Sequence, residues 1–463
     1  MRPVLALGLA FAAAGCGSTP ASSTVPPVSA APQAPVASTA PAGSASLATE
    51  PGQTKQAKLI ARMLRKVEAA RGLQSKRAIP GVSLERSALI AQVKDHVTKE
   101  LPPEAIRDEG LELALFGFIP KQFDYEGAEY ALLQDQLAGY YEPADGTMYL
   151  ASDLPDEEAD ATLAHELVHA LQDQRWNLAD RSKYRAGEGD RAEAVSALAE
   201  GDATSAMFDV TIERMYPRSG KTAIDVPDDA FAEQIRGGMN EGPSAKAPHI
   251  MRTSLVAPYI YGTLFVHALR RQGGWLAVNQ AWDDPPTTSE QIIHVDKWTA
   301  REPPIQIAAP SYATLGAGWT VADQDSEGEL GVRLAFEEWM DAKGAATLSS
   351  GWGGDRAVLL TSGDRAAFAW RLRYDPGKTR DERTAKAWAA LPAALDRTLG
   401  AAKMADATFT CHERTDRGPL AVARAGTDLI FVLGPVSTTG GQWTSAGDCA
   451  LARRWTKEIA ATP

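Results

Sequence analysis

The chain has 463 residues, of which 44% are hydrophobic, so it is long enough for two or three domains and can bury a sizeable core. Its formal net charge is −12, from 47 Lys and Arg against 59 Asp and Glu. Nucleic acid repels such an acidic chain, and the sequence contains no Lys/Arg cluster that contradicts this. Nucleic acid is therefore not an expected partner.

Residues 1–15, MRPVLALGLAFAAAG, combine one Arg with a short apolar stretch. This pattern is typical of a secretory signal peptide and is too short to span a bilayer. The segment ends in AAAGC, which resembles the lipobox of bacterial lipoproteins, although Ala13 stands where Leu is commoner. The resemblance implies cleavage before Cys16 and acylation of Cys16, which would anchor the chain in the cell envelope. The alternative is an ordinary signal peptide whose cysteine is incidental.

Residues 16–54 consist largely of Pro, Ala, Ser and Thr, with almost no large apolar side chain. Such a segment cannot offset the entropy lost on ordering a packed core. We predict a flexible tether, which would hold the folded part of a lipoprotein away from the membrane.

Residues 55–138 are predicted to be mostly helical. Apolar residues at helical spacing indicate a first helix in KQAKLIARMLRKVEAARGL, and RAIPGVSL then indicates a short strand. Ser83 is expected to cap the next helix, which ends at Pro102 and Pro103. Further helices are expected in residues 102–120 and 126–138.

Two short Tyr-containing runs flank a turn cluster in GYYEPADGTMYLAS, residues 139–152, and predict a β-hairpin. A helix carrying ATLAHELVHALQDQRW follows, then a charged loop over 177–190 and a second helix over 191–215. A strand beside that helix could bind an extended peptide by edge pairing.

Residues 217–250 are expected to be irregular apart from a short helix near DDAFAEQIRGGM, and a helix over 257–275 is expected to stop at Gly273 and Gly274.

A separate α+β domain is predicted over 326–463. Its expected strands are RAVLLTS, AAFAWRLRYD, ATFTCHER and DLIFVLG. The whole chain is therefore predicted to be α+β. Cys411 and Cys449 are expected to form a disulfide in an oxidising envelope compartment.

The string HELVH, residues 165–169, points to a zinc centre. His165 and His169 are four residues apart, so both imidazoles project from one helix face, as two zinc ligands would. Glu166 lies beside the first ligand and suits a general base acting on water. The alternative is a core helix that carries two histidines by coincidence.

A catalytic zinc usually has three protein ligands and an open fourth position. Glu193 and Glu200 are both candidates for the third ligand, since they lie seven residues apart on one face of the second helix. Here the sequence resembles the gluzincin metallopeptidases, whose HExxH helix is followed by a helix with a ligand Glu in Glu-Gly-x-Ala. The string LAEGDAT matches that pattern at Glu200, with Glu193 as the alternative.

The resemblance also implies a zincin-like fold over residues 55–325 and roles for further residues in the site. Gluzincin aminopeptidases carry Pro-Tyr-x-x-Gly, and PYIYG puts Tyr259 in the position that stabilises an oxyanion. His294 is the alternative donor, and Tyr259 could instead only pack at a helix start. The motif helix also resembles that of thermolysin-like enzymes, which implies that Asp173 supports the metal site from outside the ligand set.

Two departures limit the resemblance. The 30 residues between His169 and Glu200 exceed the gluzincin spacing, so either residues 177–190 are an insertion or Glu193 is the ligand. The Gly-x-Met-Glu-Asn string that binds a free amino terminus is absent before His165. The sequence therefore indicates an endopeptidase: a lipid-anchored metallopeptidase with one zinc per chain and a peptide or protein substrate. The alternatives are a non-catalytic zincin-fold lipoprotein and a zinc hydrolase of a non-peptide amide.

Overall fold

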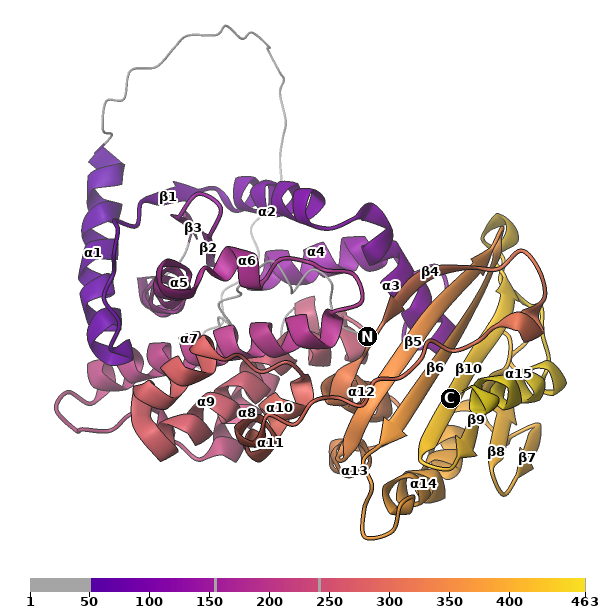
Figure 1. Cartoon of the computed structure of the whole chain (residues 1–463). Helices are drawn as coiled ribbons and strands as arrows, with labels where there is room; N and C mark the ends of the chain where they lie inside the picture. Colours follow the sequence, from indigo (N-terminus) through magenta and orange to yellow (C-terminus); the bar gives the residue numbers. More distant parts are fainter. Residues whose placement is uncertain (1–50, 154–155, 240–242, 463) are drawn as a thin grey trace, which may run out of the picture.

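The computed structural model describes residues 51–153, 156–239 and 243–462, and it is α+β as predicted. Figure 1 shows helices α1 to α11 gathered with a small sheet in one half of the molecule. Strands β4 to β11 and helices α12 to α15 form the other half. The predicted signal peptide, Cys16 and tether residues 16–50 lie outside the described residues.

The helices of the first half have these bounds: α1 Pro51–Arg71, α2 Arg86–Glu100, α3 Pro103–Phe116, α4 Tyr125–Gln136, α5 Asp156–Trp176, α6 Leu178–Arg181, α7 Gly189–Met215, α8 Asp228–Gly238, α9 His249–Asp283, α10 Ser289–Ile293 and α11 Val295–Ala300. Those of the second half are α12 Gly328–Glu337, α13 Ala342–Ser349, α14 Glu382–Leu399 and α15 Cys449–Ala461. Among the helices described, none has an apolar stretch that could cross a bilayer.

The strands are β1 Gly81–Leu84, β2 Gly139–Glu142, β3 Thr147–Ala151, β4 Thr320–Asp325, β5 Trp352–Ser362, β6 Arg365–Tyr374, β7 Met404–Asp406, β8 Phe409–His412, β9 Leu420–Ala425, β10 Asp428–Ser437 and β11 Thr444–Ser445. Short 3-10 turns lie at Ala223–Asp225, Pro243–Lys246, Ala313–Leu315 and Thr439–Gly441.

The predicted hairpin is present as β2 and β3, and it belongs to a sheet with the order β1-β3-β2. Strand β1 pairs parallel with β3, which leaves β2 at the edge of the sheet. The edge strand packs against α5, the helix that carries HELVH. The hairpin thus lies beside the candidate site.

Two local predictions in the helical half are wrong. Helix α1 begins at Pro51, so residues 51–54 are helical and not part of a tether. Ser83 does not cap α2, because its backbone is paired with Leu150 in the parallel β1–β3 ladder, and the residue before α2 is Glu85. The predicted helix stop at Gly273 and Gly274 is confirmed, because both residues have non-helical backbone angles; a second helical stretch then continues to Asp283.

Two glycines allow α7 and α9 to pack closely at Gly201 and Gly262. A Cβ added at Gly201 would lie 2.0 Å from the carbonyl carbon of Gly262, and one added at Gly262 would lie 1.8 Å from the Ala197 oxygen. Neither distance is possible for a real side chain, so the backbones can approach this closely only with glycine at both positions. Glu200 precedes Gly201, and Tyr259 lies one turn before Gly262, so this contact sets their separation.

The large sheet is antiparallel, with the order β4-β5-β6-β10-β9-β8-β7 and β11 paired to β10. The four predicted strands correspond to β5, β6, β8 and β10. Strand β4 lies before residue 326, so the predicted domain boundary cuts the sheet. Helix α15 covers one face, and it is joined to β8 by the predicted disulfide between Cys411 and Cys449.

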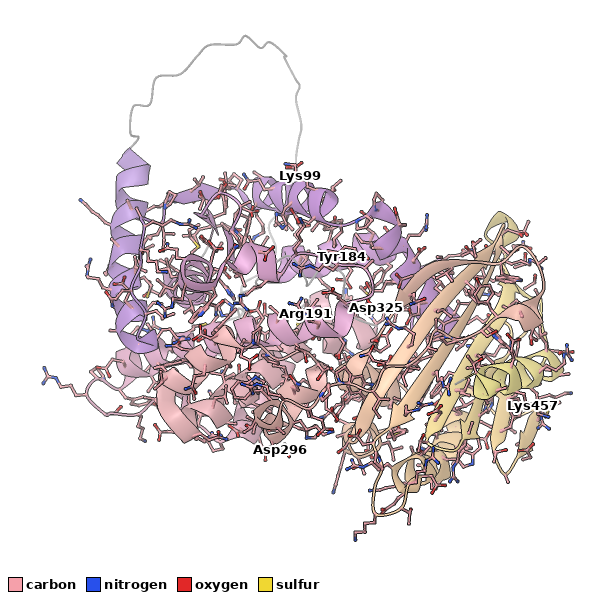
Figure 2. All side chains as sticks on the ribbon, in the orientation of Figure 1. Lys99, Tyr184, Arg191, Asp296, Asp325 and Lys457 are labelled. Atoms are coloured by element: carbon pink, nitrogen blue, oxygen red, sulfur yellow. A yellow bond between two sulfur atoms is a disulfide. The ribbon has the colours of Figure 1, made fainter. Side chains whose placement is uncertain are left out.

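The other face of this sheet shares a hydrophobic core with the helical half, so the two halves are not packed separately. Phe116, at the end of α3, lies 5.2 Å from Phe368 and 6.4 Å from Trp370, measured between ring centroids. Arg414 and Arg417 donate to backbone carbonyls at the end of α3, where unpaired carbonyls need donors. Figure 2 shows a second contact region, with Arg191 of α7 and Asp325 of β4 near the junction of the two halves.

Candidate metal centre

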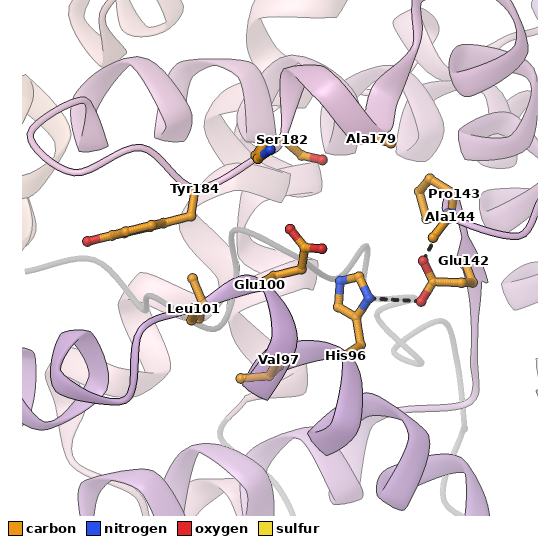
Figure 3. A pocket seen from close by; sticks show the side chains of 11 residues that line it. His96, Val97, Glu100, Leu101, Glu142, Pro143, Ala144, Ala179, Ser182 and Tyr184 are labelled. Carbon is orange, nitrogen blue, oxygen red and sulfur yellow. Dashed lines mark hydrogen bonds and ion pairs between the residues drawn. The ribbon is translucent and has the colours of Figure 1, made fainter.

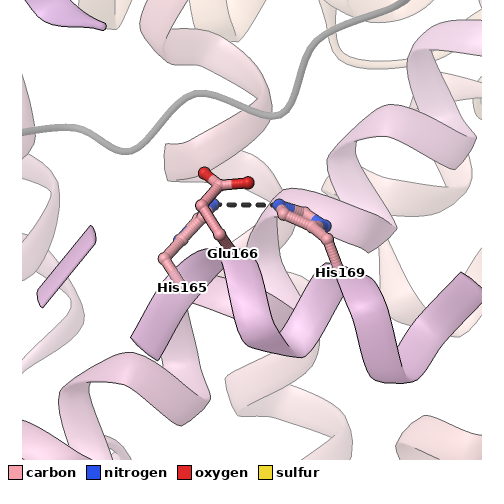
Figure 4. Close-up of side chains that lie close together, drawn as sticks. All are labelled: His165, Glu166 and His169. Carbon is pink, nitrogen blue, oxygen red and sulfur yellow. Dashed lines mark hydrogen bonds between the residues drawn. The ribbon is translucent and has the colours of Figure 1, made fainter. Parts of the chain in front are cut away.

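Helix α5 places the three motif side chains together in the interior of the helical half. His165 and His169 are each 1% exposed, and Glu166 is fully buried. Figure 4 shows the two imidazoles converging, with the Nε2 atoms 3.0 Å apart. Two ring nitrogens this close must share one proton or one cation, because two protonated nitrogens or two lone pairs would repel each other.

Glu200 of α7 completes a triangle of ligand atoms. Its Oε2 atom lies 3.0 Å from Nε2 of His165 and 3.6 Å from Nε2 of His169. Ligand atoms of a tetrahedral zinc, each about 2.0 to 2.1 Å from the ion, lie about 3.3 Å from one another. The three observed separations of 3.0, 3.0 and 3.6 Å bracket that value. The donor set, two imidazoles and one carboxylate, also suits zinc.

The carboxylate that contacts the histidines is Glu200 and not Glu193. Glu193 is also buried on α7, but it lies two turns before Glu200. The long spacing between His169 and Glu200 contains the end of α5, helix α6 and the start of α7. Helix α5 ends at Trp176, and α7 begins only at Gly189. The long connection therefore still delivers Glu200 to the motif.

The ring of His169 is held by Gln172, one turn further along α5. Nδ1 of His169 lies 2.8 Å from Oε1 of Gln172, and an amide oxygen can only accept, so Nδ1 carries the proton and Nε2 is available as a ligand. The Gln172 amide in turn donates to Ala199 O and to Asp202. Sequence reasoning missed both Gln172 and Asp202, although the i, i+3 spacing from His169 is a signal for Gln172.

Asp202 is the centre of a buried polar network behind the histidines. Its carboxylate accepts from Arg71 of α1, from Gln172 and from the Trp282 indole, the last at 2.8 Å. Both charged side chains of the Arg71–Asp202 pair are fully buried. The network ties α1, α5, α7 and α9 to one another immediately behind His169.

Glu166 lies over the site with one oxygen held and one oxygen open. Oε2 accepts a hydrogen bond from the backbone N–H of Tyr141 in β2, at 2.9 Å, while Oε1 has no partner among the described residues. Burial raises the pKa of Glu166 to about 8, and the neighbouring His169 opposes this. The edge strand thus orients a carboxylate whose second oxygen is available for a proton.

The charges of the triangle are coupled. Burial lowers the pKa of His165. Burial also disfavours a charged His169, but the nearby Glu200 carboxylate outweighs it and raises the pKa of His169 to about 9. The same attraction holds the pKa of Glu200 below its ordinary value in spite of burial. The pocket therefore stabilises a positive charge beside Glu200, as a cation site must.

Asp173 does not contact either histidine. It forms an ion pair with Arg77 at 2.7 Å and accepts from the Tyr141 hydroxyl at 3.0 Å. Tyr141 is the residue whose N–H holds Glu166, so Asp173 supports the candidate base through β2 and not the candidate ligands.

Tyr259 lies beside the ligand triangle, within α9 and not at a helix start. Its ring is stacked on that of His165, with centroids 6.0 Å apart and planes at 29°. The side chain is 4% exposed. His294, the alternative donor, instead pairs with Glu329 of α12 at 2.9 Å. Of the two, Tyr259 is the one whose ring lies against a candidate ligand, His165.

A small cavity of about 70 Å³ adjoins the β2–β3 turn. Figure 3 shows His96 of α2 pointing at Glu142, the residue after Tyr141, with Nδ1 and Oε2 2.9 Å apart. The Glu142 hydrogen bond raises the pKa of His96. This pair fixes the end of the edge strand.

A second group of carboxylates, Glu290, Glu302 and Asp375, surrounds the ammonium of Lys297. Its Nζ lies 2.6 Å from Glu290 and from Glu302, and 2.5 Å from Asp375. Lys297 already supplies the cation there, so we do not assign a metal to this group.

Residues 318–442, which span β4 to β10, match a family described as a domain of unknown function, DUF8575. No curated protein matches the chain. A crystal structure from Chloroflexus aurantiacus, described as a putative hydrolase with a novel fold, is 16% identical and covers 54% of this chain and 90% of its own, with a TM-score of 0.33. Similarity this low does not indicate a shared function, and the family match lies outside the residues of the candidate metal centre.

Proposed function

We propose that this protein is a lipid-anchored zinc metallopeptidase of the bacterial cell envelope, with His165, His169 and Glu200 as ligands and Glu166 as general base. The observation that carries the proposal is the triangle of ligand atoms, 3.0, 3.0 and 3.6 Å apart, next to a buried carboxylate with one open oxygen. Zinc, when bound, polarises a peptide carbonyl and makes water a nucleophile near neutral pH.

Glu166 accepts a proton from the attacking water through Oε1 and then gives it to the leaving amine. Tyr141 holds the other oxygen through its backbone N–H, which keeps the carboxylate turned toward the ligands. The Tyr259 hydroxyl, on the ring stacked beside His165, donates to the oxyanion that forms on the carbonyl. The carbonyl carbon gains the water oxygen and loses the amine nitrogen, so the peptide bond is hydrolysed.

The edge position of β2 supports an extended peptide substrate. An extended chain can pair with the edge of a sheet and bring its carbonyl to the residues beside that edge. The Gly-x-Met-Glu-Asn string that would hold a free amino terminus is absent from the sequence before α5. We therefore propose cleavage within chains and not at amino termini.

The purified protein is expected to hold one zinc per chain, and Glu200→Gln and His169→Ala are expected to lose it. Removal of a ligand should weaken zinc binding by more than the roughly 10- to 100-fold that loss of a supporting group costs. Zinc content by elemental analysis and competition with a chromophoric chelator measure this. Peptide cleavage should disappear with a chelator and return with zinc.

Glu193→Gln is the matched control, since it makes the same change at a buried position of the same helix and should retain zinc. Wild-type protein without stoichiometric zinc would contradict the proposal. So would His169→Ala protein that binds zinc as tightly as wild type.

Gln172→Leu is expected to weaken zinc binding about 10- to 100-fold while leaving the ligand set intact, because His169 loses the acceptor that fixes its ring. Gln134→Leu, which makes the same change at an exposed position of α4, is the control and should bind zinc like wild type. Zinc dissociation constants and thermal unfolding of both zinc-free proteins separate lost orientation from lost stability. Equal zinc affinities for the two variants would show that Gln172 does not position His169.

A further inference from the structure

A strongly basic concavity lies where α1 meets the end of α7 in this acidic chain. Five exposed cations line a cavity of about 930 Å³: Arg62, Arg65, Lys66, Arg214 and Lys221. We call these five residues the basic face. Three come from α1 and two from the end of α7 and the turn after it, so the cluster arises by folding and is not evident in the sequence. Figure 1 shows the lower end of α1 against the end of α7 at the edge of the molecule.

Among the residues whose side chains the structure describes, few carboxylates neutralise the basic face. Asp160 is the carboxylate nearest to Arg62 and Arg214 among the described ion pairs, and it lies 3.9 and 3.7 Å from them. Glu213 also lines the cavity, while Asp209 is already paired with the buried Arg270 at 2.7 Å. The cavity therefore carries excess positive charge in a chain of net charge −12, which favours an anionic partner.

Exposed apolar residues lie close in sequence to residues that line this cavity. The described residues include five large hydrophobic side chains that are exposed, and three of them, Met215, Tyr216 and Leu276, adjoin residues that line the cavity. Their exposed fractions are 54%, 60% and 67%. A soluble anion does not need apolar contacts around its site, whereas the boundary between lipid headgroups and acyl chains provides both kinds of contact.

We propose that the basic face binds the anionic phospholipid surface of a bilayer, with lipid phosphates in the cavity and Met215, Tyr216 and Leu276 entering the headgroup region. Each Lys or Arg near an anionic membrane contributes favourably, and apolar side chains add to the binding. This surface does not depend on zinc or on peptide cleavage, and it relates to the proposed function only through the envelope location.

A bilayer contact at the basic face would also orient the candidate site. Helix α1 packs against α5 and is joined to Asp202 through Arg71. The predicted tether and Cys16 precede α1, so the acyl anchor would supply nearness to the membrane while the basic face sets the orientation of the enzyme. A lipid-anchored protein with a long tether has no fixed orientation without such a second contact.

The test uses the full chain with Cys16→Ser, so that no acyl group is present, and vesicles of phosphatidylcholine with or without about one third phosphatidylglycerol. Arg62→Glu, Arg65→Glu and Lys66→Glu together should weaken cosedimentation with the anionic vesicles at least about 100-fold. The matched control is Lys99→Glu, Lys378→Glu and Lys457→Glu, which makes the same change in net charge at exposed positions elsewhere; Figure 2 marks Lys99 and Lys457. The control should weaken binding far less.

Binding of wild type should fall steeply with salt, and replacing Met215, Tyr216 and Leu276 by Ser should weaken it further. Circular dichroism and thermal unfolding establish that each variant is folded.

Equal binding to neutral and anionic vesicles would overturn the proposal, as would equal losses in the two triple variants. Displacement from vesicles by millimolar inorganic phosphate at constant ionic strength would also overturn it, since the ligand would then be a soluble phosphate. Any of these results leaves the zinc and cleavage predictions untouched.

Discussion

Glu166→Gln is expected to reduce peptide cleavage by a factor of about 100 to 10,000 while zinc stays bound, because the amide cannot take a proton from water. Gln has the same shape as Glu, and its amide oxygen can still accept from the N–H of Tyr141. The ligand triangle contains no atom of Glu166, so zinc content should equal that of wild type. The measurement is kcat/KM on a quenched peptide library, with zinc content determined on the same samples.

This variant also separates the proposed peptidase from the other functions open to the same residues. A binding protein that keeps the fold would cleave no peptide in either form. A hydrolase of a non-peptide amide would leave peptides intact but lose hydrolysis of small amides in Glu166→Gln. Glu193→Gln is again the control, with cleavage expected near wild type. Undiminished cleavage by zinc-replete Glu166→Gln protein would exclude Glu166 as the base.

The structural features that the sequence predicted correctly are those formed by one continuous segment of the chain. HELVH lies on a single helix, so periodicity alone places His165 and His169 on one face. The hairpin of β2 and β3 was predicted from its turn residues and from the short Tyr-containing runs on either side of them. The α+β class followed from the change of period along the chain. These features depend on local geometry, which neighbouring residues determine.

The missed features depend on contacts between distant segments. Strand β4, TVADQD, is polar and lies at a sheet edge, and β9, LAVARA, is rich in residues that favour helix, so neither has a strand pattern. Asp202 and Arg71 are 131 residues apart in the chain, and only the fold brings them together. Spacing left Glu193 and Glu200 equivalent as ligand candidates, whereas the α7–α9 contact at Gly201 positions Glu200.

Asp202→Asn is expected to lower the free energy of unfolding by about 3 to 5 kcal/mol, because it leaves the fully buried guanidinium of Arg71 without its counter-charge. Asparagine keeps the volume of aspartate, so no cavity contributes to the loss. Asp95→Asn is the control: Asp95 pairs with Lys99 on the surface of α2, where both side chains are more than 60% exposed. Such a pair contributes about 0.3 to 0.5 kcal/mol.

Urea denaturation of the zinc-free proteins measures both changes, and similar midpoints for the two variants would contradict a structural role for the buried pair. Arg71→Met combined with Asp202→Asn tests the cause, since it removes the cation that Asp202→Asn leaves unpaired. If the cost is the uncompensated charge, the double variant should be more stable than Asp202→Asn alone, although a methionine replaces an arginine that makes several hydrogen bonds. If the cost were lost packing, the second substitution would instead destabilise the protein further.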